Sequence, residues 1–135
     1  MRLTETIRVD TPPAEAWRVV GDLSAVDRWI PGVVGAIVEG NRRLCETVDG
    51  GQIVEQITSY SADDRSYGYA HVQQPLPIRN SRGTLSVRTD GDGSMIVWDA
   101  EFDTPSPEIA ELVEGAYRQT LESLGRLLQE PSRNH

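Results

Sequence analysis

The sequence is poor in the residues that build disulfides, metal centres and membrane spans. It holds one cysteine, Cys45, so no internal disulfide can form. Besides that cysteine it has only two histidines, His71 and His135, which is too few for a zinc cluster. No run of about eighteen apolar residues exists, and the opening MRLTETIRVD does not resemble a signal peptide. We therefore expect a cytoplasmic protein with no membrane span, no metal and no cofactor.

Positive charge is also scarce. The chain has 13 basic residues, all arginine, against 21 acidic residues, and its net charge is −8. Phosphate groups repel such a chain, so we expect neither nucleic acid nor an anionic membrane surface as a partner. A local basic pocket would still be compatible with this overall charge.

Length and composition predict one globular domain. The chain has 135 residues, of which 38% are hydrophobic and 25% charged, values that are ordinary for a domain with one core. We assign residues 1–130 to this domain and expect the last five, PSRNH at 131–135, to form a disordered tail. The domain is expected to exist as a monomer or a homodimer.

The first third of the chain predicts a strand and two short helices. Residues 3–9 alternate as a strand does. Thr11 is a suitable N-cap for a helix that has Pro12 in its first turn, since proline lacks the N–H that this turn leaves unpaired. Ser24 is expected to cap a second helix at 24–29, which Pro31 ends.

The middle of the chain predicts six strands, because alternating segments are separated by turn signals such as DGG and DGDGS. Consecutive strands joined by tight turns form an antiparallel meander. The predicted strands cover residues 33–39, 42–48, 52–60, 65–72, 80–89 and 94–102.

A long amphipathic helix closes the chain. Ser106 and Pro107 form a typical helix start, and apolar residues then recur every three or four positions to about residue 129. Gly115 lies near its middle, where close packing on a strand or room for a ligand would explain it. A sheet with one apolar face needs a cover, and this helix is the only element large enough. The space between them is a natural ligand cavity, and such pockets typically enclose about 300–1,000 Å³.

Particular segments carry a resemblance to a known family. They include TPPAEAWRVVGDLSAVDRWIPGV, the later YGY and PLPIRNSRGTLSV, and DGDGSMIVWDAEF with the final helix. The chain resembles the START-like (SRPBCC) helix-grip superfamily, and within it the bacterial polyketide cyclase/dehydrase-like branch. The resemblance implies an α+β fold of order β-α-α-β-β-β-β-β-β-α, in which a seven-stranded curved antiparallel sheet wraps round the C-terminal helix. It implies little about function, because its members include aromatase/cyclases, lipid carriers and hormone receptors.

Arg43 and Glu55 lie on strands that a DGG turn joins. If Glu55 faces inward with Ile53 and Ile57, a carboxylate enters the cavity and burial raises its pKa unless a cation is near. The two residues then either orient a polar group of a ligand or form a structural cross-strand ion pair. A register slip of one residue would turn both to the other face, so both interpretations stay open.

Tyr67, Tyr69 and His71 alternate and therefore share one face of their strand. That face either lines the cavity or meets solvent. In the cavity, His71 would be a candidate general base, and Glu55 and His71 are the candidate catalytic pair.

Arg82 shares a mostly polar strand face, which favours exposure, but its place beside the proline loop makes it a candidate for the cavity mouth. Trp98 lies on an apolar face and is expected in the core, with one edge lining the cavity. On the long helix, Leu112 and Ala116 are the expected ligand contacts.

Two proline loops, residues 29–35 and 73–78, either gate the cavity or only connect the elements. Their candidate ligand contacts are Trp29, Pro31, Pro75 and Leu76. The sequence shows no nucleophile triad and no phosphate loop; GDGS at 91–94 is a hairpin turn.

Two functions fit these residues. The first is binding of a small, largely hydrophobic molecule of lipid, polyketide or aromatic type. The second is a cofactor-independent cyclase, aromatase or dehydratase in which Glu55, Tyr69, His71 or Arg82 transfers protons. A stress- or toxin-related accessory protein with an incidental cavity is a third.

Overall fold

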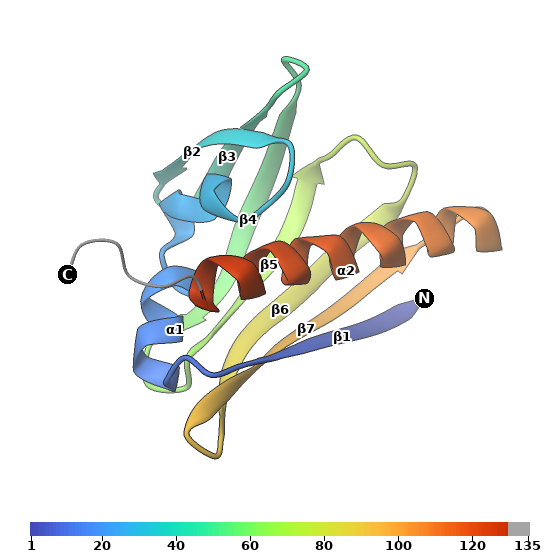
Figure 1. The fold of residues 1–135 in the computed structure, drawn as a ribbon. Coiled ribbons are helices and arrows are strands. Elements are labelled where there is room, and N and C mark those ends of the chain that lie inside the picture. Colours follow the sequence, from blue (N-terminus) through green and yellow to red (C-terminus); the bar gives the residue numbers. More distant parts are fainter. Residues whose placement is uncertain (130–135) are drawn as a thin grey trace.

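A seven-stranded antiparallel sheet dominates the computed structural model, which describes residues 1–129 (Figure 1). The predicted fold class and element order are confirmed. The six central strands pair in chain order, and the first strand joins the far edge beside the last one. The strand ends differ from the predicted ones by at most one residue. The strands are β1 (Arg2–Val9), β2 (Val33–Glu39), β3 (Arg42–Thr47), β4 (Gln52–Ser61), β5 (Ser66–Gln73), β6 (Arg79–Asp90) and β7 (Gly93–Asp103).

The helix α2 (Pro107–Gln129) crosses the inner face of the curved sheet (Figure 1). It begins at the predicted proline and buries the central part of the predicted stripe, namely Val113, Tyr117, Thr120, Leu121 and Leu124. Gly125 allows it to approach β1 closely, because a Cβ there would lie 2.6 Å from Cδ1 of Ile7. Gly115, by contrast, faces open space with no atom within 4 Å of such a Cβ. Of the two explanations expected for Gly115, close packing on a strand was therefore wrong.

Two short helices, α1 (Pro13–Val20) and the 3-10 helix η1 (Leu23–Arg28), connect β1 to β2. Both predicted N-caps were wrong. The hydroxyl of Thr11 donates to the carbonyl of Leu128 at 2.8 Å, so it ties the start of α1 to the end of α2 instead. Pro12 occupies the N-cap of α1. For η1, the carboxylate of Asp22 accepts from the backbone N–H of Ser24, and an Asp caps a helix as readily as Ser does.

The register of β5, β6 and β7 decides which side chains face α2. Tyr67 pairs with Leu85, which pairs with Trp98, and these three are buried on the inner face. Two residues along the strands, on the same face, Tyr69 pairs with Gly83. Within residues 1–129, no helix combines the length and hydropathy needed to cross a membrane.

Candidate functional site

A cavity of about 250 Å³ lies between α2 and the inner face of the sheet. Its wall contains every predicted ligand contact except Arg82 and Leu112. The volume falls below the about 300 Å³ at which typical ligand pockets begin, so a large ligand does not fit the cavity in this shape. The predicted residues in the wall are Trp29, Pro31, Arg43, Glu55, Tyr67, Tyr69, His71, Pro75, Leu76, Trp98 and Ala116.

Sequence reasoning missed eight residues of the wall. Most of them are apolar side chains that alternate with predicted contacts or follow them directly. Their inward orientation depends on strand register and helix rotation, which local patterns do not give. They are Ile30, Val33, Cys45, Ile53, Gln74, Leu85, Tyr117 and Thr120.

A buried ion pair lies at one side of the cavity. Arg43 stands opposite Glu55 in the β3–β4 ladder, and its Nε donates to Oε1 of Glu55 at 2.7 Å. Arg43 also donates to the hydroxyl of Tyr67 at 3.4 Å and to the carbonyl of Leu23 at 3.3 Å. The ion pair therefore reaches both the sheet and η1, and the structure places it on the inner face.

Mutual support keeps both charges in place despite burial. Burial by itself would raise the pKa of Glu55, but the hydrogen bond from His71 and the charge of Arg43 outweigh it and leave that pKa lowered. Burial by itself would lower the pKa of Arg43. The nearby Tyr67 and Glu55 outweigh the effect of burial, so the pKa of Arg43 is raised. Glu55 is thus a carboxylate at neutral pH, held by partners on two sides.

His71 joins this ion pair to a serine. Its Nε2 lies 3.4 Å from Oε2 of Glu55, and its Nδ1 lies 2.7 Å from Oγ of Ser81. An ionised carboxylate only accepts hydrogen bonds, so the proton of a neutral His71 belongs on Nε2. Nδ1 is then the acceptor, and the hydroxyl of Ser81 is the donor.

The sequence predicted no nucleophile triad, yet the fold brings Ser81, His71 and Glu55 into a continuous chain of contacts. Such arrangements are recognised by geometry and not by sequence order. One signal was available: Ser81 alternates with Gly83, Leu85 and Val87, opposite the polar face that carries Arg82. Ser81 is buried on that inner face, with 4% of its surface exposed.

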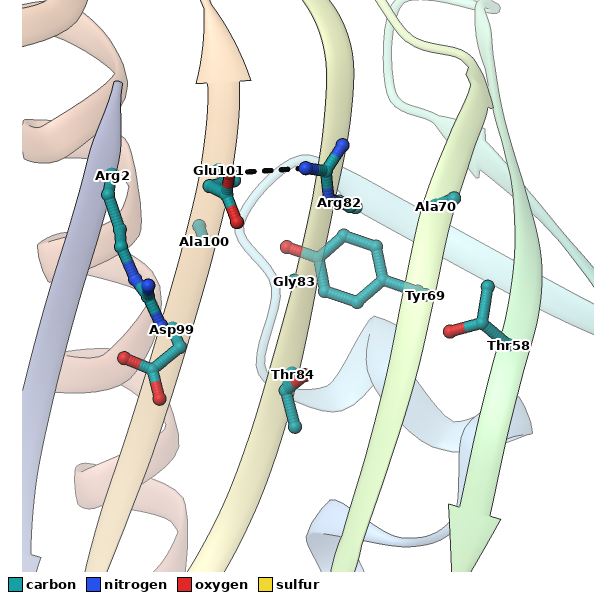
Figure 2. Close-up of a pocket in the computed structure, with 10 residues that line it drawn as sticks. All are labelled: Arg2, Thr58, Tyr69, Ala70, Arg82, Gly83, Thr84, Asp99, Ala100 and Glu101. Atoms are coloured by element: carbon teal, nitrogen blue, oxygen red, sulfur yellow. Dashed lines mark hydrogen bonds and ion pairs between the residues drawn. The ribbon is translucent and has the colours of Figure 1, made fainter.

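Three aromatic rings form the opposite wall. The indole of Trp98 donates to the hydroxyl of Tyr69 at 2.8 Å and stacks on Tyr117, with ring centroids 4.1 Å apart. The ring of Tyr69 reaches from β5 across β6 at Gly83 (Figure 2). A Cβ at Gly83 would lie 2.6 Å from the hydroxyl of Tyr69, so this strand position requires glycine.

Two buried donors of the wall lack partners. Within residues 1–129, neither Nε1 of Trp29 nor the hydroxyl of Tyr117 makes a hydrogen bond. Burial raises the pKa of Tyr117, and the nearby hydroxyls of Tyr69 and Ser81 oppose that shift. Buried polar groups are rarely left unpaired, so both donors are candidates to meet a ligand.

Arg82 and Leu112 do not face this cavity. Arg82 lies on the outer face of the sheet, where it pairs with Glu101 at 3.1 Å (Figure 2). It borders a separate surface hollow of about 320 Å³ that also contains Arg2 and Asp99. Leu112 is 56% exposed. Strand alternation explains the position of Arg82, since the inward neighbours are Ser81 and Gly83.

Both proline loops contribute to the cavity wall, through Trp29 and Pro31 and through Pro75 and Leu76. Trp29 is nearly fully buried, with 1% of its surface exposed. Trp17, by contrast, packs outside the cavity against Tyr60, with ring centroids 5.5 Å apart. Within residues 1–129, no three His, Cys, Asp or Glu side chains gather closely enough to hold a metal ion.

Comparison with known proteins identifies the family. The family model described as polyketide cyclase/dehydrase and lipid transport matches residues 1–129. The chain belongs to this family. The resemblance to the START-like helix-grip superfamily is thereby confirmed.

Solved structures share the fold of this polyketide cyclase/dehydrase family member. An uncharacterized protein from Bacillus thuringiensis has 24% identity and a TM-score of 0.86, over 95% of this chain and 98% of that one. A protein from Thermobifida fusca has 28% identity and a TM-score of 0.78, over 99% and 98%. The Zhui aromatase/cyclase from a Streptomyces species has 13% identity and a TM-score of 0.76, over 96% and 91%. No curated protein matches the chain.

Proposed function

We propose that this protein binds a small, largely hydrophobic molecule that carries a hydrogen-bond acceptor, in the cavity between α2 and the sheet. Membership of the polyketide cyclase/dehydrase and lipid transport family supports this class of function. The lining supports it as well, because most of the accessible surface of the cavity is apolar and favours ligands of matching character.

The observation that carries the proposal is the pair of unpartnered donors. Trp29 and Tyr117 line the same cavity. Nε1 of the first and the hydroxyl of the second are buried and have no hydrogen-bond partner among the described residues. Leaving a buried donor unpaired costs about 1–3 kcal/mol. A ligand oxygen that accepts from either group would recover that free energy, whereas a pure hydrocarbon would not.

The volume limits the size of the ligand. At about 250 Å³ the cavity suits a single-ring aromatic compound or a short acyl chain better than a multi-ring polyketide or a full-length lipid. The proposed ligand is therefore smaller than the polyketides and lipids that the family description names.

The experiment compares two probes that differ in their acceptor. Acetophenone has one ring and a carbonyl oxygen, and ethylbenzene has a similar shape without the oxygen. Binding is measured by calorimetry, and native mass spectrometry identifies any molecule that co-purifies. We expect acetophenone to bind about tenfold more tightly, the equivalent of one recovered hydrogen bond.

Tyr117→Phe removes the donor and keeps the ring, so it should abolish most of the preference for acetophenone. Tyr60→Phe is the matched control, because the hydroxyl of Tyr60 bonds to the carbonyl of Gly21 outside the cavity. Equal affinity for both probes in the unaltered protein, or no binding of either, would contradict the proposal.

A cyclase, aromatase or dehydratase is the second candidate function. The observation in its favour is that Glu55 and His71, an ionised carboxylate and an imidazole, stand side by side in the cavity wall. Turnover of a small cyclisation or dehydration substrate, lost in His71→Gln, is the test that would separate it from simple binding.

A further inference from the structure

His71 has no free ring nitrogen to offer a ligand. Nε2 faces Glu55 and Nδ1 faces Ser81, so both positions at which an imidazole exchanges protons are engaged. A proton can therefore pass between His71 and a bound molecule most directly through the hydroxyl of Ser81. Ser81, and not His71, is therefore the group that would contact a substrate.

We propose that Ser81 is a nucleophile that transfers the acyl group of a small apolar ester to water, with His71 as its base and Glu55 as the group that orients His71. The proposal rests on the proposed function, in that the cavity must admit the ester. It adds a covalent reaction and a residue that neither the family match nor the sequence pattern assigns.

The contacts meet the geometric requirements of an activated serine. The distance of 2.7 Å between Oγ of Ser81 and Nδ1 of His71 is that of a good hydrogen bond. The contact of 3.4 Å between Nε2 and Glu55 is longer, and such contacts are often loose in the absence of substrate. Glu55 is itself fixed by Arg43 at 2.7 Å, which holds its carboxylate toward the imidazole.

The backbone just before Ser81 forms a bulge, a feature that often accompanies functional residues. The β6–β7 ladder shifts register between Arg79 and Arg82, where three steps on β6 oppose two on β7. Asn80, just before the serine, has a φ of 51°, in the left-handed region that Asn tolerates better than most residues. Bulges redirect side chains and are over-represented beside active sites. Here the distortion immediately precedes the inward-facing Ser81.

Ser81 lies directly behind the cavity wall. His71 and Tyr117 belong to that wall, and Ser81 contacts the first and lies close to the second. A small movement of these rings, or a change of rotamer at Ser81, is needed to bring Oγ to an ester carbonyl in the cavity. This requirement restricts the substrate to compact acyl groups.

The reaction balances with water as the second substrate. Oγ of Ser81 attacks the ester carbonyl while its proton passes to Nδ1 of His71. The tetrahedral intermediate expels the alcohol, which takes that proton and leaves an acyl-serine. Water then attacks the acyl-serine, gives a proton to His71, and releases the carboxylic acid as the proton returns to Ser81.

Tyr117 supplies the donor that such an intermediate needs. Its hydroxyl is buried, has no hydrogen-bond partner among residues 1–129 and lies close to Ser81. A donor placed beside the attacked carbonyl stabilises the negative charge that develops on oxygen. Because burial raises the pKa of Tyr117, the phenol keeps its proton at neutral pH.

The experiment uses 4-nitrophenyl acetate, a compact chromogenic ester. We expect release of nitrophenol with an initial burst, and an acetyl group that peptide mass spectrometry maps to Ser81 in the unaltered protein. His71→Gln should slow acylation by about 100-fold or more, the usual effect of losing a general base. Ser81→Ala should abolish the adduct, and Ser86→Ala on the same strand is the matched control that should retain it.

Mapping in the unaltered protein keeps the result independent of whether a variant folds. An acetyl group found only on Cys45, His71 or a tyrosine, or no adduct at all, would overturn the proposal. Cys45 is a weak competitor, because burial raises the pKa of its thiol to about 11. Acetophenone binding without an adduct at Ser81 would leave the binding proposal intact and reject only the acyl transfer. Failure of both would reject the cavity as a ligand site.

Discussion

Arg43 and Glu55 form a buried ion pair across β3 and β4, with 2.7 Å between Nε and Oε1 and almost no solvent access to either side chain. Arg43 also lies over the ring of Tyr67, with its guanidinium carbon 5.4 Å from the centroid. Each charge at this position stabilises the other, because burying an unpaired charge costs far more free energy than burying an ion pair. The pair consequently links the stability of the domain to the geometry of the candidate site.

Breaking this pair should destabilise the protein strongly. Glu55→Gln leaves the charge of Arg43 without a counter-ion and should lower the free energy of unfolding by about 3 kcal/mol or more. Arg43→Met combined with Glu55→Met should recover part of that loss, since the double change removes both buried charges. Urea unfolding measures these values.

The exposed pair Arg82–Glu101 provides the matched control for that prediction. Its side chains are 57% and 47% exposed, so Glu101→Gln should change the free energy of unfolding by less than about 0.5 kcal/mol. Similar losses for the buried and the exposed pair would show that burial does not set the strength of the Arg43–Glu55 interaction.

Acid should destabilise the protein through Glu55. Its pKa in the folded state lies below its ordinary value of 4.5, so between these two values the unfolded chain binds the additional proton. The stability that this group contributes is therefore fully present above about pH 4.5 and is lost as pH falls through the lowered folded pKa. As the pH falls below about 4.5, the free energy of unfolding should fall more steeply in the unaltered protein than in Glu55→Gln. If the free energy of unfolding depended on pH in the same way in both proteins, the prediction would be wrong.

Two glycine substitutions should have opposite effects on stability. In Gly83→Ala the new methyl group would lie 2.6 Å from the hydroxyl of Tyr69 and 2.8 Å from the carbonyl oxygen of Asp99, and overpacking of this kind costs about 1–3 kcal/mol. Gly115→Ala meets open space within α2 and should stabilise the helix by up to about 1 kcal/mol. Thermal unfolding measures both, and equal effects of the two changes would refute the assigned role of Gly83.

Local patterns determined most of the architecture. Alternating strand segments, DGG and DGDGS turns and the final amphipathic stripe each depend on neighbours a few residues apart. Those short-range preferences were enough to predict seven strands and the covering helix. Alternation also grouped Tyr67, Tyr69 and His71 on one face, although it left open whether that face met the cavity or solvent.

Only the tertiary structure decided the candidate site. The register across the DGG turn placed Arg43 opposite Glu55, which a slip of one residue would have prevented. The docking of α2 brought Tyr117 into the cavity wall, while the pairing of β5 with β6 and the bulge before Ser81 brought that serine to His71. These contacts join side chains that belong to different strands and helices, and their geometry depends on how those elements pair and pack. Local physics determines the period and facing of each element, whereas the meeting of Ser81, His71 and Glu55 arises only when β4, β5 and β6 pair in the observed register.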